Sequence, residues 1–160
     1  MSNAFLYRMP GGIPGDNSRP SVATIESVVL DASNPFSVYG VPGKIVGGKF
    51  VPLAEGDEAS VIYGMLIRAF PALGSEMTNL MGPRNSVGDV MRRGYTTVKL
   101  NAGISDLGGT VYVRVGAASA GKPVGGIEAA ADGTNTVVLP GATFMSAADA
   151  DGNVEIAYNI

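Results

Sequence analysis

Glycine and proline interrupt this chain at short intervals, and that spacing limits the secondary structure it can form. The 160 residues include 23 glycines and 10 prolines, yet 46% of the residues are hydrophobic. A polar chain this rich in glycine would indicate disorder, whereas glycine combined with Val, Ile and Ala is typical of short strands joined by tight turns. We therefore expect an all-β fold, a barrel or sandwich of short strands, with a jelly-roll-like arrangement among the possibilities.

Alternation of apolar and polar residues predicts where the strands lie. In the last eight residues, Val154, Ile156, Tyr158 and Ile160 share one face, which indicates a C-terminal segment paired into a sheet. Similar runs predict further strands within residues 21–31, 38–54, 59–70, 95–103, 110–118 and 135–141. One piece, residues 85–94, has a helical pattern of a turn or two at most.

The first 20 residues differ from the rest, since Pro and Gly alternate there with few packing side chains. We expect residues 1–20 to form an extended arm, and a disordered tail and an arm that orders on a partner both remain open. Residues 21–160 would form the β-rich domain. A division of that domain into two subdomains near residues 102–109 also remains open.

A near-match to a phosphate-binding loop occurs at residues 43–49, where Gly43, Gly48 and Lys49 have the spacing G-x-x-x-x-G-K. A working loop needs Ser or Thr after the lysine and a helix that begins there. Phe50 follows instead, and Pro52 opposes a helix. The segment is therefore predicted to be a β-hairpin whose turn is Gly47-Gly48.

Catalytic signatures are missing from the sequence. The chain has no histidine and no cysteine, so it lacks the commonest general base and metal ligand, any thiolate nucleophile and any disulfide. It has no G-x-S-x-G motif, and the acidic cluster at residues 55–58 is typical of a solvated turn. We expect no enzyme and no cofactor. Asp149 and Asp151 resemble the start of a calcium loop, but Ile160 stands where the bidentate Glu belongs, which leaves weak calcium binding open.

Charge and hydropathy exclude two classes of partner. Eleven basic and 14 acidic residues give a net charge of −3, and no basic run is longer than Arg92-Arg93, so we expect no nucleic-acid binding. The start of the chain lacks the pattern of a signal peptide, and no stretch approaches 18 uncharged apolar residues. The sequence predicts a protein made in a reducing cytoplasm, without a membrane partner.

Two features suggest contacts with other protein surfaces. Arg92, Arg93 and Tyr95 stand together at the entry to a strand, and Arg and Tyr dominate binding hot spots. Arg68 is expected at a hydrated rim, and Met9 and Ile13 are the candidate contacts within the arm.

Residues 59–70 are apolar on both expected faces, with Val61, Tyr63, Met65 and Ile67 on one face. One face would fill the core, and the other needs a second sheet, the chain's own loops or a neighbouring subunit. We expect a homo-oligomer, a trimer rather than a dimer.

Several segments, in order, resemble a known family. They are "NPFSVYGVPGKIVGGKFVPLAEGDEASVIYGMLIRAFP", "SVGDVMRRGYTTVKL", "TVYVRVGAA" and "LPGATFMSAADADGNVEIAYNI". Together they are similar to the structural cement, or head decoration, proteins of tailed bacteriophages. The resemblance implies a non-enzymatic virion protein, made in the host bacterium, that binds the outer surface of an icosahedral head and stabilises contacts between major capsid protein subunits. The alternative is another β-sandwich binding module, such as a tail-fibre or carbohydrate-binding domain.

Overall fold

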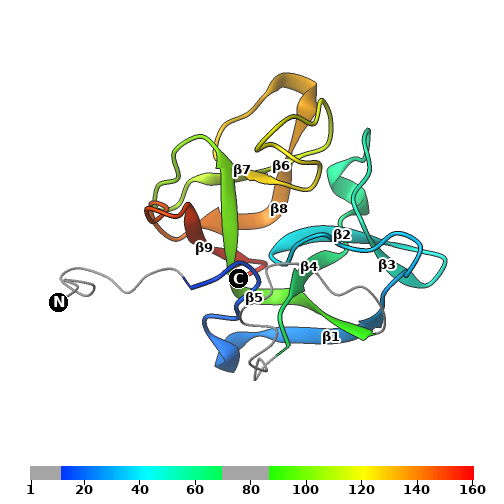
Figure 1. Cartoon of the computed structure of the whole chain (residues 1–160). Coiled ribbons are helices and arrows are strands. Elements are labelled where there is room, and N and C mark those ends of the chain that lie inside the picture. Colours follow the sequence, from blue (N-terminus) through cyan, green and yellow to red (C-terminus); the bar gives the residue numbers. More distant parts are fainter. Residues whose placement is uncertain (1–11, 70–86) are drawn as a thin grey trace.

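The computed structural model describes residues 12–69 and 87–160. Within these ranges the regular elements are strands and single turns of 3-10 helix (Figure 1), so the expected all-β class is confirmed. The strands are β1 (Thr24–Val29), β2 (Val41–Val46), β3 (Lys49–Pro52), β4 (Gly64–Ile67), β5 (Val87–Ala102), β6 (Thr110–Arg114), β7 (Ile127–Glu128), β8 (Thr136–Phe144) and β9 (Asn153–Tyr158). The 3-10 turns are Pro20–Val22, Ala59–Val61 and Gly133–Asn135.

Five strands close into a barrel. The second half of β5 pairs with β9, β9 with β8, β8 with β6, β6 with β7, and β7 returns to β5 in the one parallel pairing of the ring. Two positions predicted from alternation, Val154 and Ile156, point inward: Val154 faces Val98 on β5, and Ile156 faces Phe144 on β8. All four side chains are completely buried. The barrel interior is therefore the main hydrophobic core. The expectation that Ile160 shares this sheet face is wrong, because β9 ends at Tyr158 and Ile160 is 55% exposed.

The first half of β5 belongs to a second set of strands in the order β3-β2-β4-β5, with β1 on the far side of β5. Directly after β1, Leu30 forms a parallel bridge with Phe50 of β3. Leu66 on β4 and Val90 on β5 are paired and point into a smaller core that includes the stacked rings of Phe36 and Phe50, 5.0 Å apart. The two sets of strands thus meet within β5. Residues 103–109, near which a subdomain boundary was left open, connect two strands of the barrel.

The chain itself covers both faces of β4. Met65 and Ile67 belong to the barrel core, and Leu66 belongs to the smaller core; all three are at most 1% exposed. The expected strand over residues 59–70 is correspondingly shorter, because Ala59–Val61 form a 3-10 turn. A neighbouring subunit is not needed to cover this strand. The homo-oligomer remains a prediction, but the two apolar faces of this strand no longer support it.

The expectation of a helical segment at residues 85–94 is wrong for its described part, residues 87–94, which are the first half of β5. Val90 and Met91 are adjacent, and each is completely buried in a different core, an arrangement that an extended strand provides and a surface helix does not. Gly88 fits because an added Cβ would lie 2.9 Å from Leu30. Pairing with β1 on one side and β4 on the other fixes the extended conformation.

The predicted hairpin at Gly47-Gly48 is confirmed. Four residue pairs join β2 to β3, and both glycines have positive φ, +57° and +77°. Lys49 begins a strand rather than a helix, and its ammonium group lies 3.3 Å from the carboxylate of Asp31. The segment therefore lacks the helix N-terminus that would bind phosphate.

Candidate partner interface

The segment of residues 12–19 is attached to the barrel along β5. The Gly15 amide donates to the Thr97 carbonyl at 2.8 Å, and the Thr97 amide donates to the Asp16 carbonyl at 3.0 Å. These residues lie within residues 1–20, the stretch expected to form an extended arm. Residues 1–11, with the candidate contact Met9, lie outside the described residues.

Arg68 holds this segment from the other side. Its Nε donates to the Pro14 carbonyl at 2.9 Å, and its backbone amide donates to the Gly15 carbonyl at 2.8 Å. The guanidinium carbon lies 4.5 Å from the centroid of the Tyr39 ring. Arg68 is 2% exposed, so the expectation of a hydrated rim position is wrong: a carbonyl oxygen and an aromatic face take the place of water around the guanidinium.

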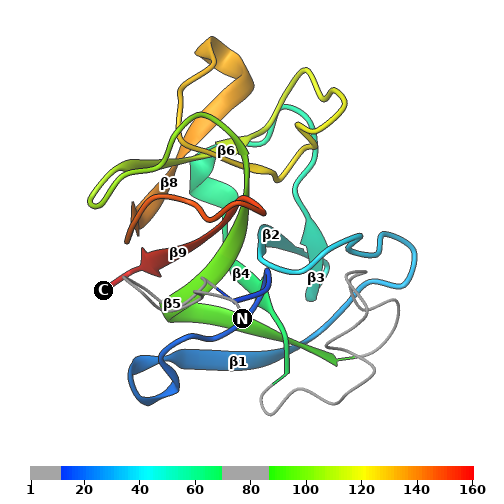
Figure 2. The ribbon, with the colours of Figure 1, turned by 60° about the vertical axis from the view of Figure 1, so that its left-hand side comes forward.

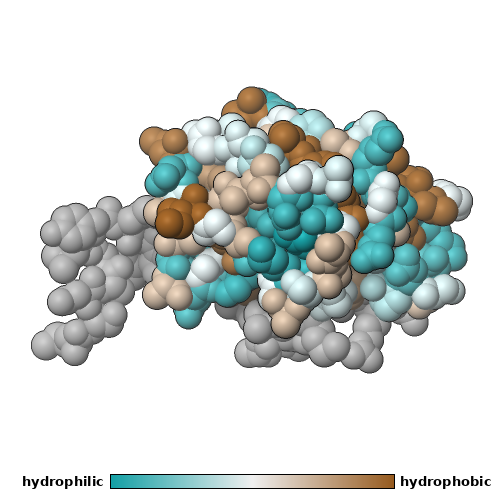
Figure 3. All heavy atoms as spheres, turned by 90° about the horizontal axis from the view of Figure 1, so that it is seen from above, coloured by the Kyte–Doolittle hydropathy of each residue, from teal (hydrophilic) through white to brown (hydrophobic). Residues whose placement is uncertain are grey.

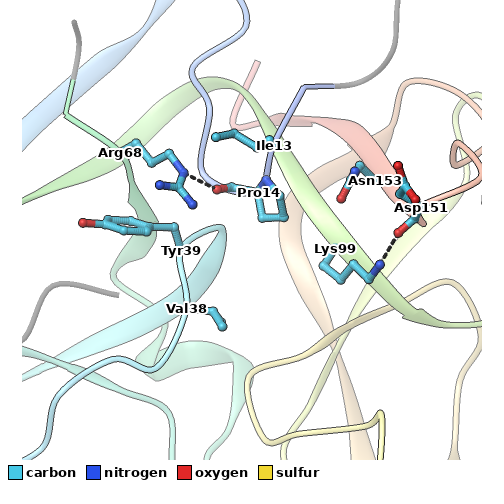
Figure 4. A pocket seen from close by; sticks show the side chains of 8 residues that line it. All are labelled: Ile13, Pro14, Val38, Tyr39, Arg68, Lys99, Asp151 and Asn153. Carbon is cyan, nitrogen blue, oxygen red and sulfur yellow. Dashed lines mark hydrogen bonds between the residues drawn. The ribbon is translucent and has the colours of Figure 1, made fainter. Parts of the chain in front are cut away.

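A cavity of about 380 Å³ opens beside the attached segment. Figure 4 shows its walls, which come from the N-terminal segment, the residues before β2, the end of β4, β5 and the start of β9. The lining residues are Ile13, Pro14, Val38, Tyr39, Arg68, Lys99, Asp151 and Asn153. Two of the six predicted contact residues, Ile13 and Arg68, are thus brought to one site across 55 positions of sequence.

The chemistry of this pocket favours an apolar guest. Its two cationic groups bond to backbone carbonyls in the wall, Arg68 to Pro14 and Lys99 to Asp151, as the dashed lines in Figure 4 indicate. Val38 is 40% exposed at the pocket. Burying an aliphatic or aromatic side chain against such walls is favourable because it removes apolar surface from water without breaking these bonds.

The remaining predicted contact residues that the structure describes, Arg92, Arg93 and Tyr95, lie on β5 and do not line the pocket. Arg92 stacks over the Tyr63 ring, 3.7 Å from its centroid, and lies 3.9 Å from Glu26. The Tyr63 hydroxyl donates to Glu26 at 2.5 Å, and this bond raises the pKa of Tyr63. Arg93 is exposed, and its side chain makes no hydrogen bond or ion pair with another described residue.

Tyr95 is covered by the attached N-terminal segment. Arg19 lies over its ring at 3.9 Å and forms an ion pair with Glu155 at 2.9 Å. The Ser18 hydroxyl also donates to Glu155, at 2.5 Å. The structure therefore gives Arg92 and Tyr95 partners within the chain, whereas the exposed guanidinium of Arg93 has no ion pair with another described residue.

In the turn at Asp149 and Asp151, the Asp149 carboxylate bonds to the turn itself. The Asp149 carboxylate accepts from the amides of Asp151 and Asn153, at 3.0 and 2.8 Å. Within residues 12–69 and 87–160, no group of three or more His, Cys, Asp or Glu side chains is placed to hold a metal ion. The same part of the chain contains no helix long and apolar enough to cross a membrane.

Comparison with known proteins identifies the family. A family model described as the XM1 gp53 minor capsid protein matches residues 1–158. The chain belongs to this minor capsid protein family. A solved structure, the capsid of Myoviridae phage XM1, contains a similar chain with a TM-score of 0.65 and 17% identity, covering 99% of this chain and 97% of that chain, which shows a shared fold. A comparison with curated proteins finds no match.

Membership of a minor capsid family confirms the resemblance to phage head proteins that the sequence analysis describes. This minor capsid protein is a structural component associated with the phage capsid, and its place is in the virion.

Proposed function

We propose that this minor capsid protein is a cement protein that binds the outer surface of the phage head and joins neighbouring major capsid protein subunits. The observation that carries the proposal is the attachment of residues 12–19 to β5 beside an open apolar pocket. A rigid barrel with an anchored segment and a pocket at the same place offers two contacts that can engage two different subunits.

The stabilisation would come from linkage. A protein that binds the assembled shell and not its separated subunits shifts the equilibrium towards the shell, by RT ln(1 + [L]/Kd) for each site. Many copies acting on one particle multiply a weak contact. No catalysis is required, which agrees with the structural role of the family.

The attached segment runs along the pocket, because Gly15 and Asp16 are bonded to Thr97 and both Ile13 and Pro14 line the pocket. The sequence of residues 1–11 includes Phe5, Leu6 and Tyr7, side chains that can bury substantial apolar area on a partner. We propose that this stretch binds one capsid subunit while the pocket receives an apolar side chain from the next.

Co-sedimentation with purified shells of the same phage tests the proposal. Unmodified protein should pellet with expanded shells and raise the temperature at which they break open. Deletion of residues 1–11 and the pocket variant Val38→Glu should each weaken pelleting at least tenfold. The matched control Val46→Glu changes another exposed valine, at the β2–β3 hairpin, and should bind normally.

The binding of the three variants and of the unmodified protein tests two separate claims. Equal binding by all three variants would refute the two-contact arrangement, while the family role would stand. No binding by the unmodified protein to any shell would refute the cement function itself. Labelling of bound protein by a reagent that cannot enter the shell distinguishes the outer surface from the inner one.

A further inference from the structure

The loop between β5 and β6, residues 103–109, presents two aliphatic side chains to solvent. Ile104 is 84% exposed and Leu107 is 74% exposed, the highest values among the large apolar side chains of residues 12–69 and 87–160. Figure 2 shows this loop in yellow-green, projecting at the left-hand margin of the barrel. Scattered exposed apolar residues are normal on protein surfaces, so exposure alone does not indicate a contact. The rigidity and the charge of the loop distinguish this pair.

The loop is held in one conformation by the end of β8. The Gly108 amide donates to the Phe144 carbonyl at 2.7 Å, and the Phe144 amide donates to the Gly109 carbonyl at 3.0 Å. Within the loop, the Gly109 amide donates to the Asp106 carbonyl at 2.9 Å and closes a turn. A partner that binds the two aliphatic side chains would therefore lose little free energy to ordering the loop.

One unpaired charge accompanies the two aliphatic side chains. Asp106 is exposed, and its carboxylate forms no hydrogen bond or ion pair with another described residue. Ser105, by contrast, is 1% exposed, so the loop presents two apolar groups and one negative charge. An unpaired carboxylate loses its water without compensation when an uncharged surface covers it. A surface that receives this loop should therefore combine an apolar pocket with a Lys or Arg side chain at the rim.

We propose that this loop inserts Ile104 and Leu107 into an apolar pocket of the major capsid protein, with Asp106 paired to a basic side chain at the rim of that pocket. The family is associated with the phage capsid, so the shell is the protein surface beside which this chain works. No residue of the loop lines the pocket beside Ile13. The inference goes beyond the proposed function because it needs neither that pocket nor a position on the outer surface of the head.

Other occupants fit the loop less well. An anionic lipid surface would repel the Asp106 carboxylate. In a second copy of this chain, the two cationic groups of the pocket already bond to carbonyls of their own wall, Arg68 to Pro14 and Lys99 to Asp151. On the face seen in Figure 3, apolar residues lie in separate areas between polar ones, so that face offers no broad apolar surface to a second copy.

The first experiment identifies the partner in virions that contain the labelled protein. The photoreactive amino acid p-benzoylphenylalanine replaces Leu107 in the full-length chain during phage growth, and crosslinked peptides are identified after irradiation. We expect crosslinks from position 107 to the major capsid protein. The matched control carries the same amino acid at Val138, another exposed apolar position, on β8, and should give at least tenfold less of that product.

The second experiment tests the chemistry of the contact by pelleting with purified shells. Ile104→Ser/Leu107→Ser should weaken binding at least tenfold and leave the melting temperature unchanged, because both side chains are exposed. The control Val138→Ser should bind normally. Asp106→Lys should also weaken binding, and Asp106→Asn should make the remaining binding less dependent on salt concentration, since salt screens an exposed ion pair.

Three results would overturn the proposal. They are crosslinks from position 107 to a second copy of this chain and none to the major capsid protein, equal pelleting by the natural protein and the double serine variant, and binding to phosphatidylglycerol vesicles that the double variant loses. The cement function would survive equal pelleting of the two proteins. If the natural protein binds no shell, the cement function fails, and the crosslinks from position 107 in virions still decide whether the loop contacts the major capsid protein.

Discussion

Arg114 and Glu128 form a two-point ion pair with both side chains about 1% exposed: Nε lies 2.5 Å from one carboxylate oxygen and Nη2 lies 3.1 Å from the other. Nη2 also lies 2.7 Å from Asp132, whose carboxylate is half-exposed. The pair joins the end of β6 to β7 and to the turn before β8. The hydrogen bonds that Arg114 donates to Glu128, and then to Asp132, raise the pKa of Arg114.

The first prediction concerns this pair. Glu128→Ala should lower the free energy of unfolding by about 3–5 kcal/mol, because it leaves a buried guanidinium without its main partner. Urea unfolding measures the change. Lys49→Ala breaks the exposed pair with Asp31 and should cost less than about 1 kcal/mol. A loss of similar size in both variants would show that burial does not strengthen the Arg114 pair.

The double variant Arg114→Met/Glu128→Leu should lower the free energy of unfolding less than Glu128→Ala alone, because it removes both buried charges together.

The second prediction is a pH dependence set by Asp132. The hydrogen bond from Arg114 lowers the pKa of Asp132 below its ordinary value of 3.8. Because the unfolded chain binds this proton more readily, the stabilisation is present above about pH 4 and is lost as the pH falls through the folded-state pKa. The difference in stability between the natural protein and Asp132→Asn should therefore shrink on acidification. A difference that stays constant from about pH 6 to pH 3 would contradict this.

The third prediction concerns the hairpin turn. Gly47→Val should lower the free energy of unfolding by about 1 kcal/mol or more, since an L side chain is strained at a φ of +57°. Gly47→Asn is the matched control, because Asn tolerates this conformation, and it should cost less. Thermal melting measures both. ATP with magnesium should leave the melting temperature unchanged, and a saturable shift would revive the phosphate-binding interpretation.

The fourth prediction concerns the attachment of residues 12–19. Arg68→Met keeps an apolar chain of similar length but removes the bond to Pro14 and the contact with Tyr39. We expect faster hydrogen exchange at the Gly15 amide, and faster cleavage before residue 20 by a protease. Exchange at the Val98 amide, deep in the barrel, should change much less. Equal acceleration at both sites would indicate that Arg68 supports the whole fold rather than this segment.

Some of this architecture could be predicted from local pattern alone. Val154, Ile156 and Tyr158 alternate with less buried neighbours, and their burial in the barrel follows from the two-residue period of a strand. The same method failed at residues 87–94. Val90 and Met91 are adjacent and point into different cores, so the stretch has no two-residue period to detect.

The residues of the candidate site are brought together by tertiary contacts that no sequence pattern indicates. Arg68 follows three apolar residues, and nothing near it in sequence indicates that Pro14 would supply its acceptor. Arg114 likewise follows Val113 in an ordinary strand pattern, and its two carboxylates come from 14 and 18 positions further along the chain. Ile13 is a candidate contact residue only as part of the expected arm, and no sequence pattern indicates the pocket that it lines.

The position of β5 in both the barrel and the second set of strands has a consequence for cooperativity. Residues 87–93 pair with β1 and β4, and residues 94–102 pair with β9 and β7, on one uninterrupted strand. Neither set of strands can lose its order without breaking the strand that the other needs. Calorimetry should therefore record a single unfolding transition, with equal calorimetric and van't Hoff enthalpies, and damage at the hairpin should lower the melting temperature of the barrel as well.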